Sequence, residues 1–185
     1  AAFLRLYSLG TNPPSLDWDE ASQGYNAYSL LKTGKDEFGR AWPVSIRSFE
    51  DYKPALYTYA TIPVVAFFGL SEFAVRLPSA IFGTATLLLT YFFVKQLFED
   101  CDRDVLFRLK VNRETVALLV TFLLAISPWH LQFSRVAFES NISLFFVVSG
   151  LLFFLKGLKE GKWLLVSAVF LSLSFYAYHS PRLVV

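Results

Sequence analysis

The sequence predicts an all-α polytopic membrane protein, with a bundle of transmembrane helices and a long first outer loop that contains juxtamembrane helices. Of its 185 residues, 55% are hydrophobic, 18% are aromatic and only 17% are charged, whereas soluble domains are usually about a quarter charged. The chain has 20 Phe, nine Tyr and four Trp. Aromatic side chains are typical of lipid-facing surfaces and of the belts at membrane–water interfaces.

Four apolar segments approach the length of about 20 residues that a bilayer crossing takes. A fifth segment, Ala55–Leu70, contains Pro63 and ends near Gly69, so we interpret it as a juxtamembrane helix. Residues 1–9 are interpreted as the end of a first transmembrane helix, and we expect the chain to be the N-terminal part of a larger membrane protein. The four transmembrane helices are expected near residues 77–98, 115–131, 142–156 and 163–180.

The distribution of Lys and Arg predicts the orientation of these helices. The link 99–114 holds four Lys and Arg residues and the link 156–162 holds three Lys. Positively charged links are typical of the cytoplasmic side. We therefore place residues 10–76 on the outer face as one long loop. The short link 132–141 and the end of the last helix, near 179–182, share that face.

An acidic stretch, "SLDWDEASQGYNAYSLL", lies early in this outer loop. It predicts a helix that Ser15 or Asp17 caps and that stops near Gly34. For Asp17 we favour a capping role. For Asp19 and Glu20, in the first turn, capping of a surface helix and a functional role compete evenly from the sequence of this stretch alone.

A second polar cluster, in "FEDYKPALYTY", comes just before the juxtamembrane helix. Pro54 suits the first position of that helix. A lysine at a helix N-terminus attracts anionic phosphate, which makes Lys53 a candidate ligand. The alternative is a snorkelling lysine with acidic neighbours, a common feature of membrane interfaces.

A third cluster, in "SPWHLQFSRVAFESN", places Arg135 and Glu139 at the outer membrane edge, where Arg76 also lies. Ionisable residues at membrane depth are candidates for function. The alternative is that Arg135 and Glu139, four residues apart, pair with each other on a helix. His130 and His179 are interpreted as interfacial or packing residues, because their spacing does not fit a metal site.

These motifs together resemble the N-terminal part of a known enzyme family. An acidic "DE" is followed by "E-x-x-K-P", by "G-x-S-E-F-A-x-R-L-P-S" at the start of a transmembrane helix, and by "S-P-W-H-x-x-F-S-R" at the end of the next. In this order they resemble GT-C membrane glycosyltransferases of the protein O-mannosyltransferase/aminoarabinose-transferase type (glycosyltransferase family 39).

The resemblance implies an enzyme that moves a sugar from a polyprenyl-phosphate lipid to an acceptor at the outer or lumenal membrane face, with inversion at the anomeric carbon. The family's catalytic acid/base falls on Asp19, with Glu20 in support. The phosphate ligands of the donor fall on Lys53, Arg76 and Arg135, and a supporting acid or metal ligand falls on Glu50 and Glu139.

The resemblance implies no certain cofactor. A divalent cation that bridges Asp19, Glu139 and the phosphate is a possible addition, since oxygen ligands suit hard cations. The implied partners are the polyprenyl-phosphate sugar donor, the lipid bilayer and an acceptor that is a protein, a glycolipid or a polysaccharide. The expected location is the plasma membrane, or the membrane of the endoplasmic reticulum in a eukaryote.

Other classes of protein fit part of the sequence. A transporter or channel subunit would carry ionisable residues in mid-span, and a non-catalytic scaffold would account for the apolar helices alone. The oligosaccharyltransferase catalytic subunit, a relative in the same superfamily, would show two or three acids in the second outer loop, where this chain has one. The net charge of +2 gives no support for nucleic-acid binding, and the single cysteine, Cys101, excludes an internal disulfide.

Overall fold

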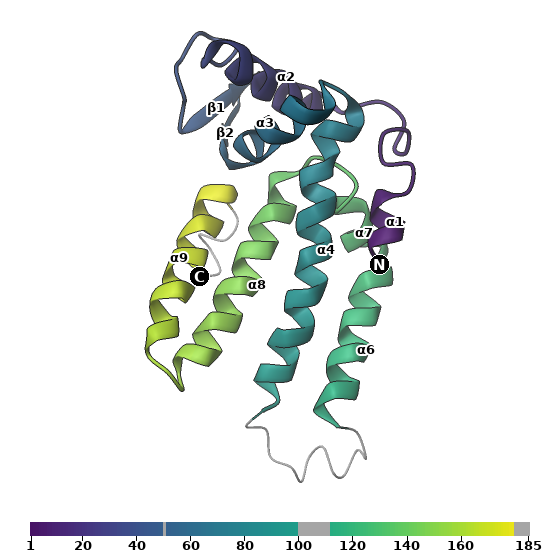
Figure 1. Ribbon diagram of the computed structural model, residues 1–185, viewed down its shortest axis with the longest axis vertical. Helices are drawn as coiled ribbons and strands as arrows, with labels where there is room; N and C mark the ends of the chain where they lie inside the picture. Colours follow the sequence, from purple (N-terminus) through teal and green to yellow (C-terminus); the bar gives the residue numbers. More distant parts are fainter. Residues whose placement is uncertain (50, 100–111, 180–185) are drawn as a thin grey trace.

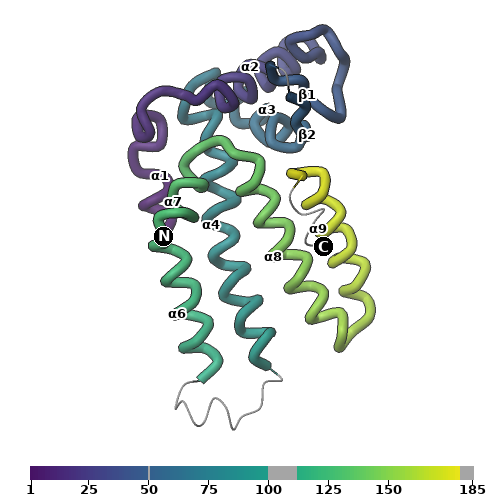
Figure 2. The backbone as a smooth tube through the Cα atoms, turned by 180° about the vertical axis from the view of Figure 1, so that it is seen from behind, coloured from purple at the N-terminus to yellow at the C-terminus, as the bar shows by residue number. Residues whose placement is uncertain are grey.

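The computed structural model describes residues 1–49, 51–99 and 112–179, which form helices and one short β-hairpin (Figure 1). Four long helices, α4, α6, α8 and α9, run side by side as a bundle, and α2, α3 and the hairpin lie across one end of it (Figures 1 and 2). The elements are α1 (Ala2–Leu6), α2 (Trp18–Thr33), β1 (Ser45–Ser48), β2 (Asp51–Pro54), α3 (Leu56–Phe68), α4 (Glu72–Leu97), α6 (Arg113–Ile126), α7 (Pro128–Phe133), α8 (Glu139–Gly157) and α9 (Lys162–Ala177).

The expected transmembrane segments are all helical, but their lengths differ. Among the described residues, α4 and α8 are long and apolar enough to cross a membrane, whereas the sequence predicts four such helices. The helix α6 has 14 residues, and so rises about 21 Å against a hydrocarbon core of about 30 Å. It ends early because Ser127, which precedes Pro128, takes an extended conformation. The described helices thus support membrane association, and the number of crossings stays a prediction.

The helix α2 begins and ends where the sequence predicts. Asp17 is the cap: its carboxylate accepts a hydrogen bond from the backbone N–H of Trp18, and it forms a capping box with Glu20. Gly34 ends the helix in the left-handed conformation that favours glycine. Of the two predicted caps, Ser15 and Asp17, the structure therefore selects Asp17.

The prediction of an all-α chain needs one correction. The strands β1 and β2 pair antiparallel as a hairpin, in which Ser48 pairs with Asp51. Alternate residues of β1, Ile46 and Ser48, are buried, as the period of a strand requires. Pro54 ends β2 and precedes the α3 cap, Ala55, so it does not occupy the first helical position that the sequence predicts.

The bundle is held closely together where α4 passes the connection between α7 and α8. Gly83 faces Ser134 there, and a β-carbon at Gly83 would lie 2.2 Å from the Ser134 hydroxyl oxygen. The side chain of Asn141 donates to the backbone carbonyl and the hydroxyl of Ser79 at 2.8 and 2.9 Å. Small residues let helices approach in this way, so that polar groups on facing helices can bond.

The end of α4, the start of α6 and the link between α8 and α9 lie at the opposite end of the bundle from α2, α3 and the hairpin (Figure 1). Lys159, in the link between α8 and α9, pairs with Glu99 after α4 at 3.0 Å. Lys95 near the end of α4 pairs with Glu114 in the first turn of α6 at 2.9 Å. These described ion pairs join neighbouring helices at that end, and the predicted division into two membrane faces stays a prediction.

Replacement of Gly83 by alanine is expected to lower the free energy of unfolding by about 1–3 kcal/mol, because α4 must move away from Ser134. Thermal unfolding in detergent measures the change. Gly161→Ala is the control, since nothing lies within 4 Å of a β-carbon there. Equal stabilities of the two variants would contradict the close packing at Gly83.

Candidate functional site

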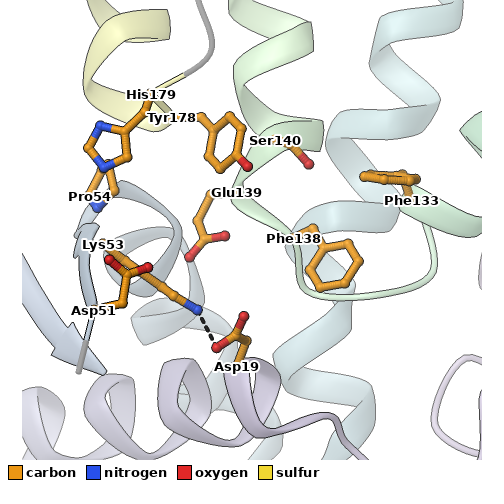
Figure 3. Close-up of a pocket in the computed structure, with 10 residues that line it drawn as sticks. All are labelled: Asp19, Asp51, Lys53, Pro54, Phe133, Phe138, Glu139, Ser140, Tyr178 and His179. Carbon is orange, nitrogen blue, oxygen red and sulfur yellow. Dashed lines mark ion pairs between the residues drawn. The ribbon is translucent and has the colours of Figure 1, made fainter. Parts of the chain in front are cut away.

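A cavity of about 420 Å³ lies where the outer layer meets the end of the bundle (Figure 3). Its walls come from α2 and β2, from the segment that joins the end of α7 to the start of α8, and from the residues after α9. The structure thus brings together the three regions that the sequence assigns to one face. The lining residues are Asp19, Asp51, Lys53, Pro54, Phe133, Phe138, Glu139, Ser140, Tyr178 and His179.

An ion pair between Asp19 and Lys53 closes one side of the cavity. Figure 3 shows the Lys53 ammonium pointing at the Asp19 carboxylate, and the two are in contact. Asp19 lies in the first turn of α2 and Lys53 lies in β2. Their side chains are 28% and 16% exposed, so both remain accessible to a ligand from the cavity. A partly exposed ion pair contributes little to the stability of the fold. Each of its two groups can therefore exchange its partner for a ligand group at little cost to stability.

Glu139 approaches the same pair from the other side of the cavity (Figure 3). It is the first residue of α8 and is almost completely buried. Its carboxylate accepts a hydrogen bond from the Gln23 side-chain amide, and the Gln23 carbonyl accepts from the Thr58 hydroxyl at 2.9 Å. The N-terminus of a helix also favours a carboxylate at this position.

The charges in the cavity are unbalanced. Three carboxylates, those of Asp19, Asp51 and Glu139, share it with one ammonium, that of Lys53. Carboxylate oxygens accept hydrogen bonds from hydroxyl or amine groups, and the ammonium attracts an anion. Among the described residues, no group of three His, Cys, Asp or Glu is arranged to hold a metal ion. A cation bridged by Asp19, Glu139 and a donor phosphate stays a prediction.

Glu20 and Arg76 are not part of this cavity. They form a buried ion pair with two contacts of 2.9 Å, and their side chains are 1% and 0% exposed. All five N–H groups of Arg76 are bonded, so none is left for a phosphate. The other contacts of the pair are the carbonyls of Leu9, Pro13 and Ser15, at 3.2, 2.7 and 2.6 Å from Arg76, and the amides of Ala137 and Asp17, 2.8 and 3.1 Å from Glu20.

This geometry places two of the predicted site residues, Glu20 and Arg76, away from the cavity. The guanidinium of Arg76 holds the loop before α2 instead of reaching the cavity, because four backbone and carboxylate groups surround it in a water-free pocket. Glu20 supports Asp19 only indirectly, since its carboxylate fixes the first turn of α2. Both residues are therefore positioning groups.

Arg135 is also removed from the cavity. It lies in the turn before α8, is mostly buried, and does not pair with Glu139, whose described side-chain partner is Gln23. The structure thus places Arg135 on the N-terminal segment, and its predicted role as a phosphate ligand stays a prediction. The carbonyls that accept hydrogen bonds from Arg135 are those of Leu4, Tyr7, Ser8 and Asn12, at 2.7 to 3.4 Å.

The remaining predicted residues have different outcomes. Glu50 lies outside the described residues. His130 is fully buried, and its Nδ1 accepts a hydrogen bond of 2.7 Å from Arg5, which agrees with a packing role. His179 lines the cavity beside Tyr178.

Sequence reasoning missed Gln23 and Thr58, which orient Glu139. Gln23 lies four residues after Asp19, so both project from the same side of α2. That spacing could have singled out Gln23. No local signal identifies Thr58, because its partner comes 35 positions earlier in the chain.

Arg76→Lys is expected to lower the free energy of unfolding by about 3–5 kcal/mol, because lysine cannot bond the Glu20 carboxylate and three carbonyls together. Chemical or thermal unfolding in detergent measures the loss. Arg113→Lys, at an exposed position in α6, is the control. A stable Arg76→Lys protein that had lost only phosphate binding would contradict the structural role.

Comparison with known proteins gives no family assignment for this chain. No protein-family model, no curated protein and no solved structure matches it. The interpretation of the site therefore depends on its geometry, its chemistry and the order of its sequence motifs.

Proposed function

We propose that the chain carries the catalytic site of a membrane glycosyltransferase. The enzyme moves a sugar from a polyprenyl-phosphate-linked donor to an acceptor at the outer or lumenal face of the membrane. The observation that carries the proposal is the meeting of Asp19, Lys53 and Glu139 in one cavity, from three segments far apart in the sequence. The resemblance of the motifs to family 39 glycosyltransferases supports the same reaction.

In the proposed reaction, Asp19 acts as the general base. Its carboxylate takes the proton from an acceptor hydroxyl, and the acceptor oxygen forms a bond to the anomeric carbon of the sugar. The bond from that carbon to the phosphate oxygen breaks at the same time, and its electron pair leaves with the polyprenyl phosphate. A direct displacement of this kind inverts the anomeric carbon. Proton transfer by a positioned side chain typically contributes about 10²–10⁴ in rate.

Lys53 stabilises the charge that grows on the leaving phosphate. Its ammonium contacts Asp19, and in the proposed reaction the donor phosphate takes over part of that contact. The exchange separates the base from its partner as the donor arrives. It places the phosphate next to Asp19, so that one residue serves the donor and the other serves the acceptor.

Glu139 holds the sugar in this proposal. Its buried carboxylate, fixed by Gln23, lies across the cavity from Lys53 and accepts hydrogen bonds from sugar hydroxyls. The excess of carboxylates over cations in the cavity favours a ligand that is rich in hydroxyl groups. A lipid tail would extend from the phosphate toward the apolar helices, which keeps the reacting bond at the end of the bundle.

Asp19→Asn in the full-length enzyme is expected to lower sugar transfer by about 10²-fold or more, because asparagine cannot accept the proton. Purified enzyme in lipid vesicles receives a polyprenyl-phosphate hexose, and the release of polyprenyl phosphate is measured. Lys53→Ala is expected to weaken donor binding as well as transfer.

Asp17→Asn is the matched control for this experiment. It makes the same chemical change two residues earlier, and asparagine caps a helix as well as aspartate does. Transfer should stay near the level of the unaltered enzyme. Full transfer by Asp19→Asn would remove Asp19 from the reaction. No release of polyprenyl phosphate by the unaltered enzyme with any donor would favour a transporter subunit or a scaffold.

A further inference from the structure

A second cavity adjoins the first at the Asp19–Lys53 pair. It is a groove of about 540 Å³ that shares Asp19, Asp51 and Lys53 with the first cavity. Its remaining lining residues are Trp18, Ser48 and Phe49. The Asp19–Lys53 pair therefore lines both cavities.

Two exposed aromatic side chains mark this groove. Trp18, the first residue of α2, is 69% exposed, and Phe49, next to β1, is 66% exposed. Neither ring contributes to a hydrophobic core, and both lie within reach of Asp19 across the groove. Large apolar side chains that converge on a polar cavity are typical of ligand sites.

The backbone of Phe49 has an unusual conformation. Phe49 has a φ of 54°, a conformation that bulky residues rarely adopt. Phe49 directly follows Ser48, the last residue of β1, which pairs with Asp51. The short hairpin thus directs the ring to the side of the groove where Trp18 lies. Ser48 is buried, and its hydroxyl has no hydrogen-bond partner among the described residues.

We propose that this groove binds the acceptor, and that the acceptor presents a sugar ring of a glycan. The inference rests on the proposed function, in which Asp19 must touch an acceptor hydroxyl. One face of a pyranose ring carries C–H groups that pack on an aromatic face, and its edge carries hydroxyls that donate to carboxylates. Trp18 and Phe49 supply the aromatic faces, and Asp19 and Asp51 supply the carboxylates.

The two cavities then receive the two substrates. The donor phosphate and sugar occupy the cavity beside Glu139, next to the bundle, and the glycan occupies the groove beside Trp18. The substrates meet at Asp19, which lines both. Proximity of this kind supplies a large part of the rate in a two-substrate reaction.

Glycan binding is tested first without a donor. The full-length protein in detergent is titrated with mannotriose, cellotriose and chitotriose, and with a peptide rich in Ser and Thr, by calorimetry. At least one trisaccharide is expected to bind. Trp18→Ala is expected to weaken that binding about tenfold, and Trp18→Phe to weaken it less, because an aromatic face remains.

Trp42→Ala is the matched control, because Trp42 is another exposed tryptophan of the outer loop, stacks on Tyr59 and does not line the groove. Its affinity for the trisaccharide should equal that of the unaltered protein. In the transfer assay, Trp18→Ala should raise the KM for the glycan more than the KM for the donor. Equal glycan affinity in Trp18→Ala and Trp42→Ala would overturn the proposal.

The results separate this inference from the proposed function. Sugar transfer to the peptide, with no binding of any trisaccharide, would overturn the glycan groove and leave the transferase standing. Trisaccharide binding that depends on Trp18, with no release of polyprenyl phosphate from any donor, would support the groove as a glycan site and overturn the transferase.

Discussion

The buried ion pair between Glu20 and Arg76 is the interaction on which the rest of the site depends. It joins the first turn of α2 to the start of α4, and through the Ala137 amide to the turn before α8. Two charges in a water-free pocket are stable only when all their hydrogen-bonding groups are satisfied. The carbonyls of the loop before α2 supply the remaining contacts of Arg76. The pair therefore fixes α2 across the end of the bundle, which sets the position of every residue that α2 contributes.

The consequence for the site follows from helix geometry. Consecutive residues of an α-helix point about 100° apart, so that Asp19 turns outward when Glu20 faces Arg76. The two acids of the "DE" motif thus have separate roles, one in the framework and one in the cavity. Gln23 comes one turn after Asp19 and reaches Glu139, so the same helix face orients carboxylates on both sides of the cavity.

The partly exposed Asp19–Lys53 pair contrasts with the buried pair. A base and a cation held in contact at the junction of two cavities suit a transfer reaction, because each can exchange its partner for a substrate group. The proposed transfer needs this separation: the donor phosphate approaches Lys53, and the acceptor hydroxyl approaches Asp19.

The sequence by itself determined the helices and their grouping. Asp17 and Gly34 mark the ends of α2 through local hydrogen bonds and backbone conformation. Because positively charged links favour the cytoplasmic side, the acidic loop and Glu139 are expected together on the opposite face. Only the tertiary structure decided what the charged side chains touch. An arginine near a helix end, such as Arg76 or Arg135, can bond either a phosphate or backbone carbonyls. The path of residues 4–15 brings backbone carbonyls to both guanidinium groups. Gln23 bonds to Glu139, which lies 116 positions later in the chain. The packing of α2 on the bundle brings the two together, and no local sequence pattern encodes that packing.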